Sequence, residues 1–113
     1  MAKAAKLQAK DSEALRDFLR ELRRRLGEKL IEVKLFGSKA RGDDSPESDI
    51  NVLVVVRGAG VEIEDRILDI AFEVNLKHEV YISPRVVDRA ILDDPVWKIT
   101  PFLRSISREG IPL

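Results

Sequence analysis

The stretch "LFGSKARGDDSPESDINVLVV", residues 35–55, decides how this chain is interpreted. An apolar run leads into Gly37 and Ser38, ten residues follow, and Asp49 then opens a second apolar run. Residues i and i+2 of a β-strand point to the same face of a sheet, so we expect Asp49 and Asn51 to project side by side. An acid and an amide at this spacing suggest oxygen ligands for a metal ion.

The residues before this pair suggest a binding site for an anion. Gly37 has no side chain, which lets backbone N–H groups approach an anion closely, and Ser38 adds a hydroxyl donor. Arg41 carries a forked cation that could reach a phosphate. Magnesium takes few protein carboxylates and further oxygens from phosphates and water. The two halves of the stretch therefore favour a nucleotide carried with Mg²⁺.

Length and composition indicate one soluble domain over residues 1–113, with residues 1–10 as a flexible lead-in. Apolar residues make up 44% and charged residues 35%, which is ordinary for a globular protein. Basic and acidic residues balance at 20 each, so overall charge indicates neither a nucleic-acid nor a membrane partner. Nucleic-acid binding would depend only on the Arg23–Arg25 run, which we interpret as a solvated helix face.

The residue types that are absent exclude some classes of site. The chain has no cysteine, which excludes disulfides and thiolate nucleophiles and agrees with a cytoplasmic location. No apolar run approaches the ~20 residues that a membrane-spanning helix needs. The first ten residues lack the apolar segment of a signal peptide.

Hydrophobic periodicity predicts alternating helices and strands. The order is α-β-β-α-β-α, which indicates an α+β fold (an α/β sandwich) with a small mixed β-sheet packed with helices. "EVYIS" is expected to be the third strand, halted by Pro84, and "VVDRAIL" a short helix or turn. The other expected elements are a helix from Asp11 or Ser12 to Gly27, strands at 30–36 and 50–56, a helix at 61–78 and a last helix from Pro101 to Gly110.

The opening stretch carries a resemblance to a known family. Gly37-Ser38, ten residues and Asp49-x-Asn51 resemble the G-S-x10-D-x-D signature of the polymerase-beta-like nucleotidyltransferase superfamily. More narrowly, the stretch resembles the minimal nucleotidyltransferases, whose pattern reads G-S-x-A-R-G, a spacer, S-D-x-D and an apolar strand. The positions that match this pattern are Gly37, Ser38, Ala40, Arg41, Gly42, Ser48 and Asp49.

The resemblance implies a nucleotidyltransferase-like fold and a reaction. Such enzymes transfer a nucleoside monophosphate from a nucleoside triphosphate, here ATP, to an acceptor hydroxyl, using divalent metal ions such as Mg²⁺ or Mn²⁺. The nucleotide would bind Gly37, Ser38 and Arg41, and the catalytic metal ligands would be Asp49 and Asn51. The resemblance also implies a small helical HEPN-type partner protein in an antitoxin-like role. A homodimer is the alternative assembly that would complete the site.

Two departures from the family pattern lead to an alternative function. Asn51 offers a neutral oxygen where the family has a second aspartate, and opposite charges ~4 Å apart interact by about 4 kcal/mol at an effective dielectric near 20 before desolvation. The third strand has no aspartate, and Glu79 is the one acid there that could serve as a third metal ligand or base. The alternative is a catalytically weakened or inactive member that acts as a nucleotide-binding or partner-binding scaffold.

Several other residues have simpler structural explanations. His78 ends a predicted helix, where a cation suits the helix dipole. Tyr81 and Trp97 are interpreted as core or interface packing residues. Asp88, Asp93 and Asp94 are expected to form turns or caps.

Overall fold

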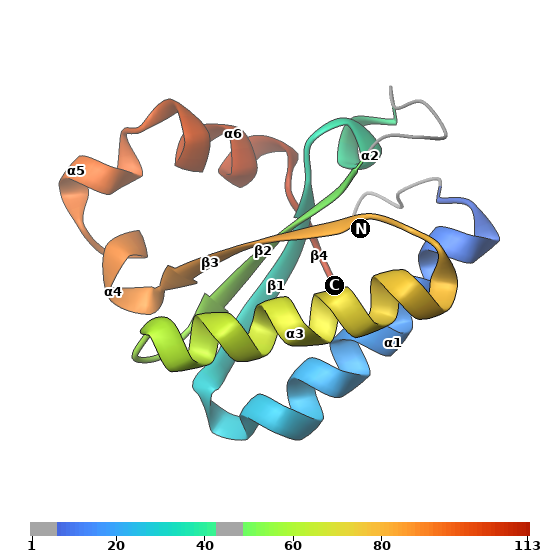
Figure 1. Cartoon of the computed structure of the whole chain (residues 1–113). Coiled ribbons are helices and arrows are strands. Elements are labelled where there is room, and N and C mark those ends of the chain that lie inside the picture. The colour runs from blue at the N-terminus through green and yellow to red at the C-terminus, as the bar shows by residue number, and fades with distance from the viewer. Residues whose placement is uncertain (1–6, 43–48) are drawn as a thin grey trace.

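A four-stranded mixed sheet lies at the centre of the chain over residues 7–42 and 49–113, which are those that the computed structural model describes (Figure 1). The strand order is β3-β2-β1-β4, with β1 antiparallel to both β2 and β4, and β2 parallel to β3. The sheet is therefore mixed, as predicted. The strands are β1 (Leu30–Phe36), β2 (Ile50–Val56), β3 (Ile82–Asp88) and β4 (Ile111–Pro112).

Two long helices, α1 (Ala9–Leu26) and α3 (Val61–His78), cover one face of the sheet (Figure 1). Their apolar stripes meet alternate residues of the strands in the main hydrophobic core. Phe18 and Leu22 of α1 and Ile67 and Ile70 of α3 have no exposed surface. The buried sheet residues in this core are Val33, Leu35, Ile50, Val52, Val54, Val56, Ile82 and Ile111.

Three short helices, α4 (Arg89–Leu92), α5 (Pro95–Lys98) and α6 (Pro101–Glu109), lie on the other side of the sheet (Figure 1). Leu53 and Val55 of β2 pack there against Ile106 of α6. Because strand residues alternate in direction, Asn51 points to this second face together with Leu53 and Val55. The face with the smaller core therefore carries the predicted site.

The predicted bounds of β1, β2 and α3 are confirmed, and so is the last helix, which Thr100 caps. The predicted bounds of the third strand are wrong, because β3 begins at Ile82 and continues through Pro84 to Asp88. β3 is an edge strand, and the N–H and C=O of Ile82 bond outward to the Asn75 side chain at 2.7 and 3.1 Å. Pro84 lies two residues after Ile82, so its nitrogen also faces away from β2. The missing N–H of Pro84 therefore removes no hydrogen bond between the strands.

Smaller differences have local causes. The first helix begins at Ala9, two residues before the expected cap Asp11. The pairing of β1 with β2 shifts register between Leu30 and Glu32. Because of this shift, Ile31 does not join Val33 and Leu35 in the main core and packs instead in the smaller core with Leu53, Val55 and Ile106. Three elements were not predicted: a 3₁₀ helix at Gly27–Lys29, helix α5 and strand β4. No helix within residues 7–42 and 49–113 combines the length and apolar character needed to cross a membrane.

Charged side chains of α1 form ionic contacts with the elements around the helix, and two of these contacts involve the buried carboxylates of Asp11 and Asp17. The Nε2 atom of His78 lies 2.9 Å from Oδ2 of the buried Asp17 carboxylate, and Lys77 lies 3.5 Å from the same oxygen. The hydrogen bond from His78 is the main cause that holds the pKa of Asp17 below its ordinary value. His78 is therefore a structural link between α3 and α1.

The second contact anchors α2 (Ser38–Arg41), the single helical turn that follows β1. Lys39 is only 2% exposed, and its Nζ lies 3.0 Å from Oδ2 of Asp11 at the start of α1. A buried charge is costly unless it is paired. The turn that carries Ser38 is thus held against α1 by an ion pair that water barely reaches.

We expect Asp17→Asn to lower the free energy of unfolding by about 1–3 kcal/mol at neutral pH, because a hydrogen bond to a charged group is lost. Since the folded pKa of Asp17 lies below the unfolded one, the stability it contributes is present above the unfolded pKa and is lost as pH falls through the folded pKa. The difference in unfolding free energy between the wild type and Asp17→Asn should therefore become smaller below about pH 4. Urea unfolding across this range measures it, with exposed Asp69→Asn as control. A difference in unfolding free energy that does not change with pH would contradict the lowered pKa of Asp17.

We expect Asp11→Asn to lower the free energy of unfolding by about 1–3 kcal/mol, because it removes the charged hydrogen-bond partner that lies 3.0 Å from the Lys39 ammonium. The double variant Asp11→Leu/Lys39→Met should recover most of this loss, since an apolar pair removes the charge as well. Urea unfolding of both variants, with exposed Glu13→Gln as control, measures the difference. An Asp11→Asn variant as stable as the control would show that the pair does not hold the turn.

Candidate functional site

The two halves of the opening stretch meet where β1 ends and β2 begins. Phe36, the last residue of β1, is the register partner of Asn51. Gly37 follows with φ +79°, and a Cβ atom there would lie 2.9 Å from the amide nitrogen of Asn51. Only a residue without a side chain allows both this backbone conformation and this approach. The structure therefore brings Gly37 and Asn51 into direct contact.

Helix α2 turns the chain away from the sheet directly after Gly37. The Gly37 carbonyl accepts hydrogen bonds from the amides of Ala40 and Arg41, both at 3.1 Å, and Gly42 ends the turn with φ +82°. Ala40 packs against the main core and Lys39 is buried, so the inner side of the turn is anchored. Ser38 begins the turn, where helical amides have no partner within the helix and the dipole favours an anion.

The predicted metal ligands lie two residues apart at the start of β2, and Asn51 points to the second face. Asp49 is exposed and directly precedes β2, and Asn51 is half-buried between neighbours on both sides. The register partner of Asn51 on β3 is Ser83, which is exposed. The strand position beside Asn51, where a third acid would be expected, therefore holds a hydroxyl. The predicted third strand included Ser83 as its last residue, but the sequence alone did not show that Ser83 pairs with Asn51.

Glu79 does not lie on β3. It ends α3 with φ +54° in the left-handed region and is exposed, three residues before the strand begins. Its expected place at the entry of the third strand is therefore wrong, and its role as a ligand stays a prediction. Among residues 7–42 and 49–113, no three acid or histidine side chains converge as a metal cluster. Ser48 and the acids Asp43, Asp44 and Glu47 lie outside the described residues.

Helix α6 contacts residues of β1, β3 and α2 next to this site. The Phe102 ring packs edge-to-face on Phe36, with centroids 5.5 Å apart, and the Arg85 guanidinium lies 4.8 Å from the centre of the Phe102 ring. Arg41, the predicted phosphate ligand, contacts Glu109 at the end of α6, with 3.2 Å between Nη1 and Oε2. Neither Phe102 nor Arg85 was singled out from the sequence, because only the tertiary fold places them beside Asn51.

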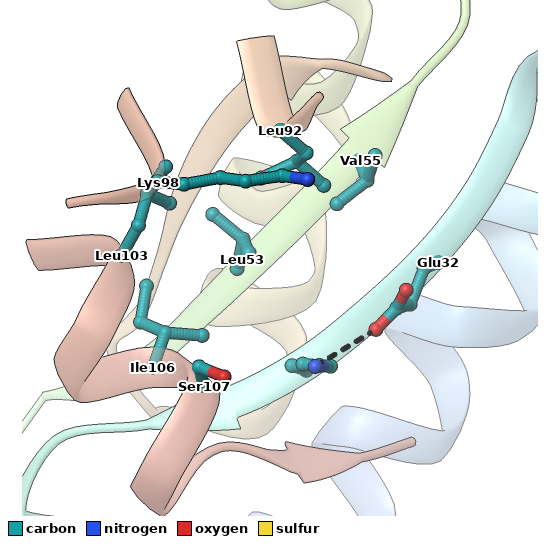
Figure 2. A pocket seen from close by; sticks show the side chains of 9 residues that line it. Glu32, Leu53, Val55, Leu92, Lys98, Leu103, Ile106 and Ser107 are labelled. Atoms are coloured by element: carbon teal, nitrogen blue, oxygen red, sulfur yellow. Dashed lines mark ion pairs between the residues drawn. The ribbon is translucent and has the colours of Figure 1, made fainter. Parts of the chain in front are cut away.

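A groove continues along the same sheet face from the Asn51 end of β2. Figure 2 shows Leu53 and Val55 on its floor and Lys98 reaching across it toward Leu92. Glu32 and Lys34 form an ion pair of 3.2 Å at its rim. The groove encloses about 340 Å³, within the usual range for small-molecule sites. Its remaining walls are Leu103, Ile106 and Ser107.

The chain has clear relatives among characterised families. A family model described as "Nucleotidyltransferase domain" matches residues 15–110. Two relatives from Methanocaldococcus jannaschii, each named "Putative protein adenylyltransferase", are 36% and 30% identical to it over 100 and 101 residues. Both alignments cover 88% of this chain and 94% of the relative.

Solved structures share the fold. One described as a "putative minimal nucleotidyltransferase" superposes with a TM-score of 0.57 at 25% identity, covering 97% of this chain and all of that one. A toxin-antitoxin crystal structure with AMP-PNP gives 0.56 at 17% identity, covering 93% of this chain and 72% of that one. Together with the family model, which spans most of the sequence, these likenesses show that the chain belongs to the nucleotidyltransferase domain family.

Proposed function

We propose that this protein transfers a nucleoside monophosphate from ATP to a hydroxyl on an acceptor protein. The observation that carries the proposal is the contact of Gly37 with Asn51, which joins the predicted phosphate-binding turn to the predicted metal ligands. In the reaction the acceptor oxygen bonds to the α-phosphorus, the bond from that phosphorus to pyrophosphate breaks, and the hydroxyl proton leaves to solvent. The names of the relatives as protein adenylyltransferases support this choice of acceptor.

The donor set at the start of β2 fits Mg²⁺ or Mn²⁺. Asp49 supplies an exposed carboxylate, and the Asn51 amide nitrogen lies against Gly37, so its oxygen lies on the opposite side of the amide. Two protein oxygens leave coordination positions for phosphate and water, as Mg²⁺ prefers. When bound, the ion would neutralise charge that develops on the phosphate oxygens.

The chain's own residues would position the triphosphate. Gly37 and Ser38 would bind phosphate oxygens through backbone N–H groups and the serine hydroxyl. Arg41 would exchange its contact with Glu109 for a phosphate, because a phosphate offers a guanidinium two charged acceptors. The nucleoside end would then extend along β2 toward the groove of Figure 2.

The partner that we propose as acceptor is a small helical HEPN-type protein, which follows from the resemblance to minimal nucleotidyltransferases. A second copy of the chain is the alternative acceptor. Light scattering of the purified protein, alone and mixed with such a partner, separates these assemblies.

A specific observation favours a second candidate function, a scaffold that binds nucleotide without transferring it. Asn51 is neutral, and its neighbour on β3 is Ser83, so neither strand position beside Asp49 adds a negative charge. A site of this kind would bind ATP weakly with Mg²⁺ and would give no labelled acceptor. Both candidate functions therefore predict binding of ATP, but only the first predicts transfer of the nucleotide to an acceptor.

Calorimetry with ATP and Mg²⁺ tests the shared part of both candidates. We expect Mg²⁺-dependent binding that Asp49→Asn weakens at least tenfold, because the one carboxylate in the donor set is lost; tenfold corresponds to about 1.4 kcal/mol. Asn51→Asp should strengthen the Mg²⁺ dependence by a similar factor. Thermal unfolding of each variant controls for misfolding. No binding of any nucleoside triphosphate would contradict both candidates.

Gly37→Ala tests the contact that joins the two halves of the site. The added methyl would lie 2.9 Å from the Asn51 amide nitrogen, so we expect ATP affinity to fall at least tenfold. Gly58→Ala is the matched control, because Gly58 also has a positive φ of +74° but has open space around a Cβ. Both variants should lose about 1–2 kcal/mol of stability from the left-handed backbone. Equal ATP affinity in the two variants would remove the contact from the mechanism.

A further inference from the structure

Helix α3 leaves a row of large apolar side chains exposed on the side opposite its buried stripe. Leu68, Phe72 and Leu76 follow one another at intervals of four residues and are 49%, 64% and 67% exposed. Tyr81, just beyond the end of the helix, is 73% exposed. Residues four apart on a helix are neighbours on its surface, so Leu68, Phe72 and Leu76 form one row, and Tyr81 lines a hollow together with Leu68 and Phe72. These four side chains are called the apolar stripe. Exposed patches of this kind mark interaction sites more often than single exposed residues do.

The apolar stripe is continuous with the proposed site. A hollow of about 360 Å³ runs between α3 and the edge of the sheet, and its walls include Leu68, Phe72 and Tyr81. The same hollow is lined by Asp49 and by Ser83, the register partner of Asn51. A molecule that rests on the stripe would therefore have one end beside the proposed metal ligand.

The edge of the sheet in this hollow is closed to strand addition. Ile82 uses its outward N–H and C=O groups in bonds to the Asn75 side chain, and Pro84 has no N–H to offer. Strand addition needs a row of free backbone groups. The occupant of the stripe must therefore pack through side chains, as an amphipathic helix does.

The charged residues around the stripe indicate the sign of the charge on the molecule that binds there. The exposed surface of α3 before Phe72 carries four acids, Glu62, Glu64, Asp65 and Asp69, against one cation, Arg66. The basic residues at the end of the helix, Lys77 and His78, contact Asp17 of α1 instead. A second copy of this surface would add more acid than base, so charge complementarity favours a basic partner.

We propose that the apolar stripe of Leu68, Phe72, Leu76 and Tyr81 is the docking surface for the acceptor protein. The acceptor presents there an amphipathic helix whose apolar face is flanked by lysine or arginine. Docking on the stripe brings an acceptor hydroxyl to the Asp49 end of the hollow, where the transfer takes place. The assignment of the occupant as acceptor rests on the proposed function, whereas the stripe and its charges do not.

Peptide binding to the full chain tests the surface. The probe is a fluorescent amphipathic peptide of about 20 residues, long enough to form a helix, with leucines on one face and lysines beside them. We expect the wild-type protein to bind it, Phe72→Glu to bind at least tenfold more weakly, and Ile99→Glu to bind as wild type does. Ile99 is a matched control because it is 70% exposed and lies after α5. A leucine–glutamate peptide should not bind.

The outcomes separate this proposal from the proposed function. Equal binding by Phe72→Glu and Ile99→Glu, or equal binding of the two peptides, overturns the docking surface. A wild-type dimer that Phe72→Glu converts to a monomer also overturns it, because the occupant is then a second copy. ATP affinity measured in the same variants should not change. If the wild type binds the peptide but no nucleotide, the docking surface stands and the transfer function falls.

Discussion

Gly37 and Asn51 touch at the point where the chain crosses from the end of β1 to the start of β2, and the proposed site depends on this contact. Strands β1 and β2 are antiparallel, so residues that precede and follow a long connection are brought opposite one another. The proposed phosphate-binding turn and the proposed metal ligands can therefore share one edge of the sheet. The positive φ of Gly37 and the missing side chain are both needed for that geometry.

The surrounding packing explains why this edge is well defined. The main core holds β2 on one face through valines and Ile50, which leaves Asn51 to the other face. Lys39 fixes the turn after Gly37 to α1 through its buried ion pair with Asp11. On the second face, Phe102 of α6 packs against Phe36, next to Asn51. Three contacts from separate elements thus converge on a short segment of backbone.

The sequence predicted the elements whose signals are local. Periodicity located β1, β2 and α3 correctly, because their buried residues recur at the spacing of the structure they form. It could not place β3, because whether Pro84 ends a strand depends on which side of that strand faces the sheet. That side is set by the pairing with β2, and the outward groups of Ile82 bond to Asn75 of α3.

The candidate site was predictable in part for the same reason. The spacing of Gly37, Ser38, Asp49 and Asn51 is visible in the chain, and the resemblance to minimal nucleotidyltransferases depends on it. Ser83, Arg85 and Phe102 join the site only through strand pairing and helix packing, which no local pattern contains. Burial of Lys39 could not be predicted either, because a lysine in a polar stretch has the signature of a solvated residue.

The central claim is that one bound ATP with its metal ion lies between the Gly37–Ser38 turn and the Asp49–Asn51 pair. Nuclear magnetic resonance of the isotope-labelled protein with ATP and Mn²⁺ tests it most directly, because the paramagnetic ion broadens only signals near it. The account predicts selective loss of the Gly37, Ser38 and Asn51 amide signals, with those of Gly27 and Ala90 unchanged. Broadening centred on other residues, or equal throughout the chain, would contradict it.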